Sequence, residues 1–293
     1  MGVDDSANLR IGALSKRVGV SPELLRAWER RYGLLRPSRS AGGFRLYSGS
    51  DEARVQSMQR YLEAGLSAAE AARLAVAGAD RVAAERGSGK ARLTELATEL
   101  EAALARFDES AAHAALDRLF SAFRLQTVLR EVVLPFLAEL GRRWERGEAT
   151  VAQEHFASNL LRGRLLGLAR GWADAAGPRA VLACAPGELH DLPLISFGLA
   201  LAARGWSITY LGPDTPIATI KETLVGRERP LVVISAVSAA RLRAVQDELA
   251  ELATDVRLAL AGGGASKELA SATGAALLLD EDPVTAAERV AEL

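Results

Sequence analysis

Residues 11–48 have the sequence IGALSKRVGVSPELLRAWERRYGLLRPSRSAGGFRLYS. Apolar residues recur at helical spacing over residues 11–18 and 22–32, and a short glycine-containing turn separates these two segments. Ser21 can accept a hydrogen bond at the start of the second segment, and Pro22 suits the first position of a helix. The stretch therefore predicts two short helices joined by a tight turn, a helix-turn-helix.

The end of this stretch, residues 36–48, alternates apolar and polar residues around Gly42-Gly43, which is typical of a two-stranded hairpin, or wing. Residues 10–60 hold eleven basic and four acidic side chains, a balance of +7, whereas the whole chain has a net charge of −1. Positive charge confined to one segment indicates binding to a polyanion. The arginines of the second helix are suited to phosphates and base edges in a major groove, and a solvated basic helix is the alternative.

The same residues resemble the winged helix-turn-helix of the MerR family over essentially the whole DNA-binding module, including its Arg-x-Trp-Glu and Gly-Phe-Arg-Leu-Tyr segments. The resemblance implies sequence-specific binding to promoter DNA as a dimer or a higher homo-oligomer. The DNA contacts that it implies are Arg26, Arg30 and Arg31 on the recognition helix and Arg39, Arg45 and Tyr47 in the wing. We expect Leu25, Trp28 and Leu34 to pack in the core, as large apolar side chains usually do.

The length of 293 residues predicts two or three domains, and a content of 49% hydrophobic and 25% charged residues is ordinary for globular proteins. The one cysteine, Cys184, excludes an intramolecular disulfide and a Cys-rich metal site, and we expect it to be a small buried residue. No apolar run reaches the ~18 residues that span a bilayer, and the N-terminal sequence lacks a secretory signal. We therefore expect a soluble, cytoplasmic protein that does not bind membranes.

The middle of the chain predicts helices. Residues 51–77 predict a helix with a break at Gly65-Leu66-Ser67, and the glycines and serine of residues 78–90 predict a linker. Leucine and phenylalanine then recur every three or four positions from Leu93 to Trp172, over a length typical of a four-helix bundle. The predicted domains are the winged helix-turn-helix domain (1–80), a linker (81–90), the four-helix bundle (91–176) and an α/β domain (177–293).

Beyond Gly177-Pro178, short apolar runs alternate with helical segments. The expected strands are residues 180–184, 207–211, 231–235, 257–263 and 276–280, and the expected helices are residues 192–204, 216–226, 239–253, 265–272 and 283–292. This alternation predicts a doubly wound parallel domain of the Rossmann-like or flavodoxin-like kind, which binds ligands beyond the carboxyl ends of its strands. The sequence lacks both Gly-x-Gly-x-x-Gly after the first strand and a Walker lysine loop, so nucleotide-phosphate binding is poorly supported.

His190 lies in the segment PGELHDLP, directly after the first strand of this predicted domain. A neutral imidazole at that edge can ligate a metal ion, and Glu188 or Asp191 could accept a hydrogen bond from its other ring nitrogen. A surface histidine or a hydrogen-bonded core histidine is the alternative. Ser235 ends the third strand and Gly262-Gly263 follows the fourth, where missing side chains allow the close approach of a large ligand.

Together the Glu-x-His-x-x-Pro, Ser-x-Val and Gly-Gly segments resemble the cobalamin-binding fold of methionine synthase and its relatives, whose usual pattern is Asp-x-His-x-x-Gly, Ser-x-Leu and Gly-Gly. The resemblance implies that His190 is the lower ligand of the cobalt, and that the displaced nucleotide tail passes Ser235 and the glycines. The cofactor contacts implied in this domain are Glu188, His190, Asp191, Ser235, Gly262 and Gly263. Pro193 stands where glycine is usual, so the entry loop differs from the common pattern.

Trp144, nine further residues and then Glu154-His155 reproduce a signature of the CarH/LitR-type, adenosylcobalamin-dependent MerR regulators, and the chain resembles this family over residues ~10–290. The resemblance implies that Trp144, Glu154 and His155 cap the upper face of the corrin. It also implies a tetramer that represses transcription in the dark and comes apart when light breaks the cobalt–carbon bond. Loss of multivalency alone can weaken apparent DNA affinity by ~10²–10⁴. Without the signature, Trp144 would be a bundle core residue and Glu154-His155 a polar surface pair.

One departure leaves a second function open. Glu145 follows Trp144, where some light-sensing members have a histidine that ligates cobalt after photolysis, so His155 or His113 would have to take that role here. The alternative is a MerR-type regulator whose modified or degenerate cobalamin domain senses a corrinoid or another small molecule without light. A cobalamin-dependent enzyme is less compatible with the sequence, because 293 residues leave no room for a substrate barrel. We therefore expect a regulator and not an enzyme.

Overall fold

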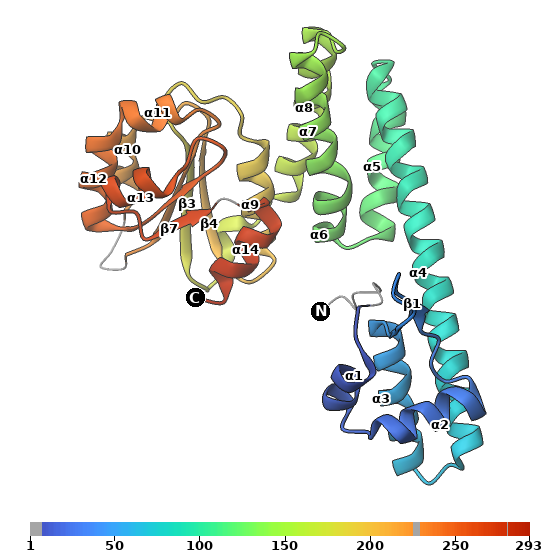
Figure 1. Ribbon diagram of the computed structural model, residues 1–293. Helices are drawn as coiled ribbons and strands as arrows, with labels where there is room; N and C mark the ends of the chain where they lie inside the picture. Colours follow the sequence, from blue (N-terminus) through green and yellow to red (C-terminus); the bar gives the residue numbers. More distant parts are fainter. Residues whose placement is uncertain (1–7, 225–228, 280) are drawn as a thin grey trace. The chain divides into compact units, whose positions relative to one another are not determined.

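The computed structural model describes residues 8–224, 229–279 and 281–293 (Figure 1). The chain divides into two compact units, of which the first ends at Thr94 and the second runs from Glu95 to Leu293. In the described part of the chain, no helix combines the length and the apolar character needed to cross a membrane.

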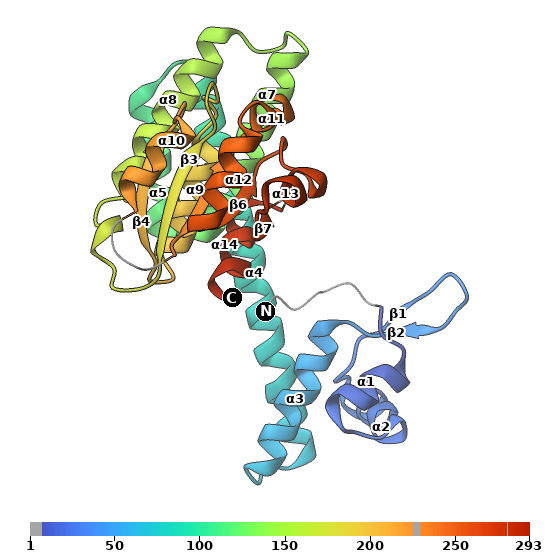
Figure 2. The ribbon, with the colours of Figure 1, turned by 90° about the vertical axis from the view of Figure 1, so that its left-hand side faces the viewer.

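The N-terminal unit has the predicted helix-turn-helix and wing. Its elements are α1 (Ile11–Val18), α2 (Pro22–Tyr32), β1 (Ser38–Arg39), β2 (Arg45–Leu46), α3 (Gly49–Glu63) and the beginning of α4. Ser21 caps α2 by accepting a hydrogen bond from the Leu24 N–H, as expected. The antiparallel pair β1–β2 forms the wing, which Figure 2 shows projecting beside α1 and α2.

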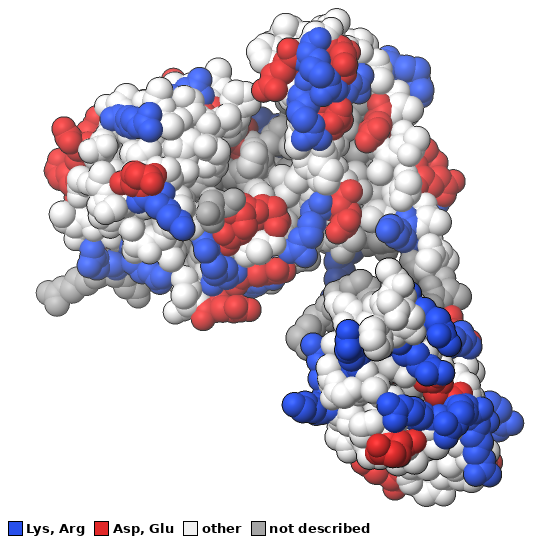
Figure 3. Space-filling model, viewed as in Figure 1, with Lys and Arg blue, Asp and Glu red and all other residues white. Residues whose placement is uncertain are grey.

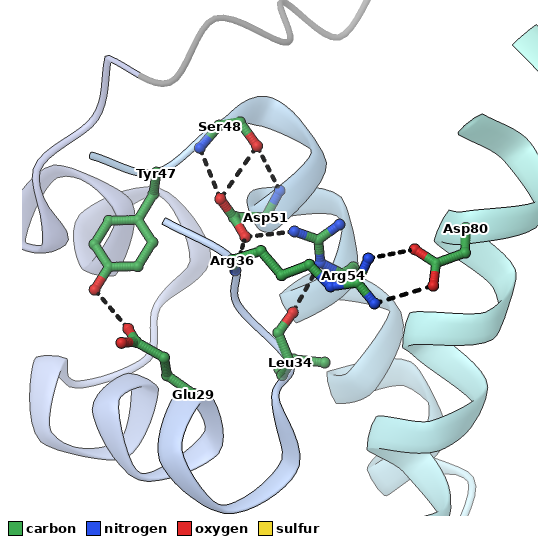
Figure 4. Close-up of polar contacts among 8 residues, drawn as sticks. All are labelled: Glu29, Leu34, Arg36, Tyr47, Ser48, Asp51, Arg54 and Asp80. Carbon is green, nitrogen blue, oxygen red and sulfur yellow. Dashed lines mark hydrogen bonds and ion pairs between the residues drawn. The ribbon is translucent and has the colours of Figure 1, made fainter. Parts of the chain in front are cut away.

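A single apolar cluster forms the core of this unit and contains the expected residues Leu25, Trp28 and Leu34. Beside it, a buried ion pair between Asp51 and Arg54 of α3 anchors the segment that leads from α2 to the wing (Figure 4). Nε of Arg54 donates to the Leu34 carbonyl at 2.8 Å, and the Arg36 N–H donates to Asp51 at 2.7 Å. Both charges are thereby satisfied, which a buried pair requires if it is not to destabilise the fold.

The structure corrects the prediction of a linker at residues 81–90, because these residues are helical. They belong to α4 (Ala68–Ala105), a continuous helix of 38 residues. A glycine in a helix interior costs about 1 kcal/mol relative to alanine, and the neighbouring alanine, arginine, glutamate and lysine residues favour the helix strongly enough to continue through it. The break expected at Gly65-Leu66-Ser67 is confirmed, since α3 ends at Glu63 and Gly65 has a φ of 88°.

The second unit begins with four helical segments. The first is the end of α4, the second is α5 (Glu109–Ala122) and the fourth is α8 (Val151–Leu168). The third consists of three consecutive elements, namely α6 (Leu125–Val128), the π-helical turn η1 (Leu129–Val133) and α7 (Leu134–Glu145). Leucines at the predicted helical spacing are buried between these segments, among them Leu96, Leu100, Leu116 and Leu161. A short 3₁₀ turn, η2 (Trp172–Asp174), leads to the sheet.

The rest of the second unit is the predicted α/β fold. Five parallel strands, β3 (Arg179–Cys184), β4 (Ser207–Gly212), β5 (Leu231–Ser235), β6 (Arg257–Ala261) and β7 (Leu277–Leu279), lie in the order β4-β3-β5-β6-β7. The helices are α9 (Leu192–Ala202), α10 (Ile217–Ile220), α11 (Ala239–Ala244), α12 (Gln246–Asp255), α13 (Lys267–Thr273) and α14 (Pro283–Ala291). The strand expected at 257–263 ends earlier, at Ala261, and residues 225, 226 and 280 of the expected elements lie outside the described residues.

The helices cover the sheet on both sides. Helices α9 and α14 pack together on one face, and α10 to α13 line the other with the apolar cluster that includes Val232, Leu249 and Leu258. Helix α8 of the bundle packs against α9, which lies between the bundle and the sheet in Figure 1. The carboxyl ends of β3 and β5 lie next to each other within the sheet. The strand order changes direction between these two strands, and such sheets bind ligands at this position.

Candidate functional site

His190 lies in the loop after β3, at the carboxyl edge of the sheet. Its Nδ1 atom is 2.6 Å from Oε1 of Glu188, and the side chain is 65% exposed. Glu188 is fully buried and accepts further hydrogen bonds from the backbone N–H groups of His190 and Val237, at 2.9 and 2.8 Å. Nδ1 therefore carries the proton that it donates to Glu188, which leaves the lone pair of Nε2 free to bind a metal ion.

The charge of Glu188 is held in place by its hydrogen-bond partners. Burial alone would raise the pKa of this carboxyl group, but the two backbone N–H groups, the His190 ring and the Arg241 guanidinium together lower the pKa to about 2. Nη1 of Arg241 lies 2.5 Å from Oε2 of Glu188. Glu188 is thus ionised at neutral pH and fixes the tautomer of His190.

Of the two predicted acceptors for the imidazole, the structure uses Glu188, and the prediction for Asp191 is corrected. The carboxylate of Asp191 is buried and contacts Arg162 of α8 and the Tyr210 hydroxyl. Cys184 is buried beneath this loop, as expected. Burial, together with the nearby charges of Asp191 and Glu188, raises the pKa of its thiol to about 12, so the thiol stays protonated.

Two exposed apolar side chains at this edge of the sheet were missed by sequence reasoning. Leu189 precedes His190, and Val237 lies in the loop after β5, so that both stand at the same edge of the sheet. Exposed leucine and valine at the same edge as an exposed imidazole form a surface suited to a large, partly apolar ring. The signal in the sequence was the position of these residues in the loops that follow two buried strands.

A cavity of about 120 Å³ lies at the carboxyl ends of β5, β6 and β7, between α9 and α14. Its lining consists mostly of apolar side chains: Pro193, Leu194, Phe197, Val233, Ser235, Ala261, Gly262, Leu279, Glu281, Pro283 and Ala286. The structure thereby brings together the predicted Ser235 and Gly262, and also Pro193, the residue that departs from the usual pattern. Gly263 does not line this cavity.

The glycines after β6 serve mainly to bring two loops together. Gly262 has a φ of 84°, and a Cβ atom there would lie 2.6 Å from the Ala236 carbonyl oxygen. A Cβ atom on Gly264 would lie 2.5 Å from the Ser238 carbonyl carbon. The expectation that these glycines leave backbone open for a ligand is therefore modified, because their missing side chains first make room for the loop after β5.

The residues expected above the corrin gather at one end of the bundle. Trp144 lies at the end of α7, and Glu154 and His155 lie in the first turns of α8, across a short turn. Trp144 is 51% exposed, so its alternative role as a core residue of the bundle is contradicted. His155 is exposed and Glu154 accepts a hydrogen bond from Ser158 at 2.6 Å. An indole, an imidazole and a carboxylate are therefore presented together at this end.

The N-terminal unit presents a separate, basic surface. Figure 3 shows lysine and arginine side chains gathered over this unit. All five arginines that sequence reasoning selected as DNA contacts are exposed: Arg26, Arg30, Arg31, Arg39 and Arg45. They come from α2 and the wing, the two elements that reach a groove and its flanking phosphates in winged helix-turn-helix proteins.

The structure corrects the prediction that Tyr47, the sixth residue selected as a DNA contact, lies on the DNA-binding surface. Its side chain is fully buried, and its hydroxyl donates to Oε2 of Glu29 at 2.8 Å (Figure 4). Burial and the Glu29 carboxylate both raise the pKa of this hydroxyl. Oε1 of Glu29 lies 3.0 Å from Nε of Arg45, so one carboxylate of α2 holds two residues of the wing. Sequence reasoning missed this role of Glu29, although it belongs to the quoted Arg-x-Trp-Glu segment.

Comparisons with known proteins define the class, a DNA-binding transcriptional regulator with a cobalamin-binding unit. The chain matches the MerR HTH family regulatory proteins over residues 9–77 and the B12 binding domain family over residues 96–166. It is 32% identical to the HTH-type transcriptional repressor CarH of Myxococcus xanthus over 249 residues, which are 83% of each chain. It is also 34% identical to the repressor CarA of the same organism over 242 residues, 82% of this chain and 79% of CarA. The chain belongs to the family of CarH-type MerR transcriptional regulators.

A solved structure supports the fold of the second unit. The monomethylamine corrinoid protein of Methanosarcina barkeri matches 68% of this chain and 98% of its own length, with a TM-score of 0.56 and 19% identity. At this level of identity the likeness concerns the fold alone. The predicted fold class, a helical bundle followed by a parallel α/β domain, is confirmed.

Proposed function

We propose that the chain is a light-responsive, adenosylcobalamin-dependent repressor that binds promoter DNA in the cytoplasm as a homo-oligomer. The observation that carries the proposal is the geometry of His190, whose Nδ1 is held by an ionised Glu188 while Nε2 is left on an exposed edge of the sheet. This arrangement suits a lower axial ligand of cobalt. The proposal assigns no enzymatic reaction to the chain.

The residues present fit a cobalamin. His190 supplies the nitrogen ligand, Leu189 and Val237 supply apolar surface beside it, and the cavity at Ser235 and Gly262 would receive the nucleotide tail. The exposed Trp144, with Glu154 and His155, would contact the upper group by stacking and hydrogen bonding. When bound, adenosylcobalamin supplies a cobalt–carbon bond that light can cleave.

The DNA-binding role in this proposal belongs to the arginines of α2 and the wing. Arg26, Arg30 and Arg31 would contact the major groove, while Arg39 and Arg45 would contact flanking phosphates. A homo-oligomer that binds several half-sites gains affinity from multivalency, and its dissociation would release the promoter without a change in any single contact. Light would then regulate transcription through the number of protomers that are held together.

An absorbance titration with adenosylcobalamin in the dark tests the cofactor assignment. We expect the wild-type chain to take up the corrinoid, and His190→Ala to lose uptake or to weaken it at least tenfold. His113→Ala is the matched control, because His113 lies on α5, where its ring approaches Glu109 of the same helix. Equal uptake by His190→Ala and the wild type would refute the lower-ligand role.

Gel filtration and DNA binding before and after green illumination test the light response. We expect a larger assembly with adenosylcobalamin in the dark, and both a smaller assembly and weaker promoter binding after illumination. The second candidate function is a regulator that senses a corrinoid or another small molecule without light. Glu145 after Trp144 and Pro193 in the cavity lining favour it. Corrinoid uptake with an assembly that illumination leaves unchanged would select this second candidate.

A further inference from the structure

Arg162, in the middle of α8, forms an ion pair with the residue that follows His190. Its Nη2 atom lies 2.7 Å from Oδ2 of Asp191. The Asp191 side chain is only 4% exposed and also accepts a hydrogen bond from the Tyr210 hydroxyl. Tyr210 is itself packed edge-on against Trp172, with ring centroids 6.1 Å apart. The ion pair therefore joins a helix of the bundle to the loop between β3 and α9.

The carboxylate of Asp191 does not cap α9, although its position in the chain suggests that it should. Asp191 is the N-cap residue of α9, where an aspartate side chain ordinarily accepts a hydrogen bond from an N–H of the first turn. No such bond is made in this helix, which lies wholly within the described residues. The charge of Asp191 is used for Arg162 and Tyr210 instead, so the contact with the bundle replaces a local stabilising interaction.

Arg162 and His155 lie on the same face of α8. They are seven residues apart, which is close to two helical turns and about 10.5 Å along the axis. The Arg162 side chain is 36% exposed, and its Nε atom is buried without a hydrogen-bond partner among the described residues. Its terminal nitrogen pairs with Asp191, and α8 packs against α9. One helix face thus carries a residue of the proposed upper cap and the contact to the loop below.

We propose that Arg162 is a positioning residue that couples the two faces of the cofactor site: through Asp191, it ties the helix that carries Glu154 and His155 to the loop that carries His190. A displacement of α8 then shifts that loop, because moving the arginine away would leave the buried carboxylate of Asp191 without its charged partner. The reverse also holds, so the position of the lower ligand biases the upper cap. This inference rests on the proposed function in so far as these residues bind cobalamin.

Amide hydrogen exchange of the cofactor-free, full-length chain tests the link directly. We expect Arg162→Met to speed exchange in residues 186–193 by about tenfold, as local opening becomes easier, and Arg162→Lys to have an intermediate effect. The matched control is Arg164→Met on the same helix, because Arg164 pairs with Asp117 of α5, another helix of the bundle, and not with the loop after β3. We expect this control to leave exchange in residues 186–193 unchanged. An unchanged rate in Arg162→Met, or an equal rise in both variants, would overturn the proposal.

A second variant guards against a general loss of folding. Asp191→Asn keeps the shape of the side chain and removes its charge, and we expect it to reproduce the faster exchange of Arg162→Met. Because both substitutions break the same contact, the double variant should exchange no faster than either single variant. Additive effects would mean that the two residues act separately, and the proposed link would then be refuted.

The rate at which loaded protein releases adenosylcobalamin provides the readout with cofactor. We expect release to be about tenfold faster from Arg162→Met than from the wild type, and unchanged in Arg164→Met. Equal release from Arg162→Met and the wild type would overturn the coupling. Failure of the wild-type chain to take up any corrinoid would instead refute the proposed function, while the exchange rates of the cofactor-free chain would still decide whether Arg162 holds the His190 loop.

Discussion

Replacing Gly262 by alanine should lower the free energy of unfolding of the second unit by about 3 kcal/mol, because two separate costs fall on one residue. The first is the backbone conformation, since a φ of 84° costs a residue with a side chain about 1–2 kcal/mol. The second is steric, since the new Cβ atom would lie 2.6 Å from the Ala236 carbonyl oxygen and 3.2 Å from the Ser235 hydroxyl. Overpacking of this kind costs about 1–3 kcal/mol.

Gly205→Ala separates the two costs. Gly205 has nearly the same φ, 85°, but a Cβ atom built on it meets no atom within 4 Å in the described structure. Only the backbone cost then applies, and the expected loss is about 1–2 kcal/mol. The difference between the two variants therefore measures the close packing of the loops after β5 and β6.

Calorimetry of the full-length chain checks these values. For a unit of about 200 residues, 1 kcal/mol corresponds to roughly 2–4 °C, so Gly262→Ala should lower the melting temperature of the second unit by roughly 6–12 °C. Gly205→Ala should lower it by roughly 2–8 °C. Equal losses in the two variants would refute the reasoning, because the steric contact at Gly262 would then contribute nothing.

Three further predictions concern buried polar groups. The pKa of Glu188 is lowered from 4.5 to about 2, so its charge stabilises the fold above pH 4.5, and this contribution is lost as the pH falls from 4.5 to about 2. Between these pH values, the free energy of unfolding measured in urea should therefore fall less for Glu188→Gln than for the wild type. Tyr47→Phe should cost about 1 kcal/mol of stability through the lost bond to Glu29 and change DNA affinity by less than about threefold, and a much larger change in a DNA titration would restore Tyr47 as a direct contact. Arg54→Met should cost about 3–5 kcal/mol in thermal unfolding, because it leaves the charge of Asp51 buried without its partner, and a cost below 1 kcal/mol would contradict that account.

Local sequence patterns predicted most of the fold. The helices of the N-terminal unit follow from apolar spacing and from the cap at Ser21, and each of the five strands was expected within a few residues of its observed bounds. The contact between Glu188 and His190 was also predictable, because the two residues are two positions apart in one loop. The predicted linker was wrong because glycine weakens a helix only slightly, and the composition of the flanking residues outweighed it.

Contacts between distant segments could not be predicted in this way. Tyr47 packs in the apolar core, and its buried hydroxyl donates a hydrogen bond to Glu29, 18 residues earlier. Asp191 pairs with Arg162 because the packing of α8 on α9 places that arginine beside it. Glu29 belongs to the Arg-x-Trp-Glu segment, but its spacing does not identify Tyr47 as its partner, and Arg162 is one of many charged residues on the helices. The docking of whole elements decides such contacts.

The π-helical turn η1 makes the number of residues before α7 as important as their identity. Such a turn holds one residue more than an α-helical turn of the same rise. Deleting any one residue from Leu129–Val133 would restore the regular helix, and everything from there to Trp144 would rotate by about 100° around the axis. The indole would then face a different neighbour although every side chain of the proposed cap remained in the sequence. In an alignment of related chains, a one-residue gap at this point would therefore indicate that Trp144 faces another direction, and not only that the helix is shorter.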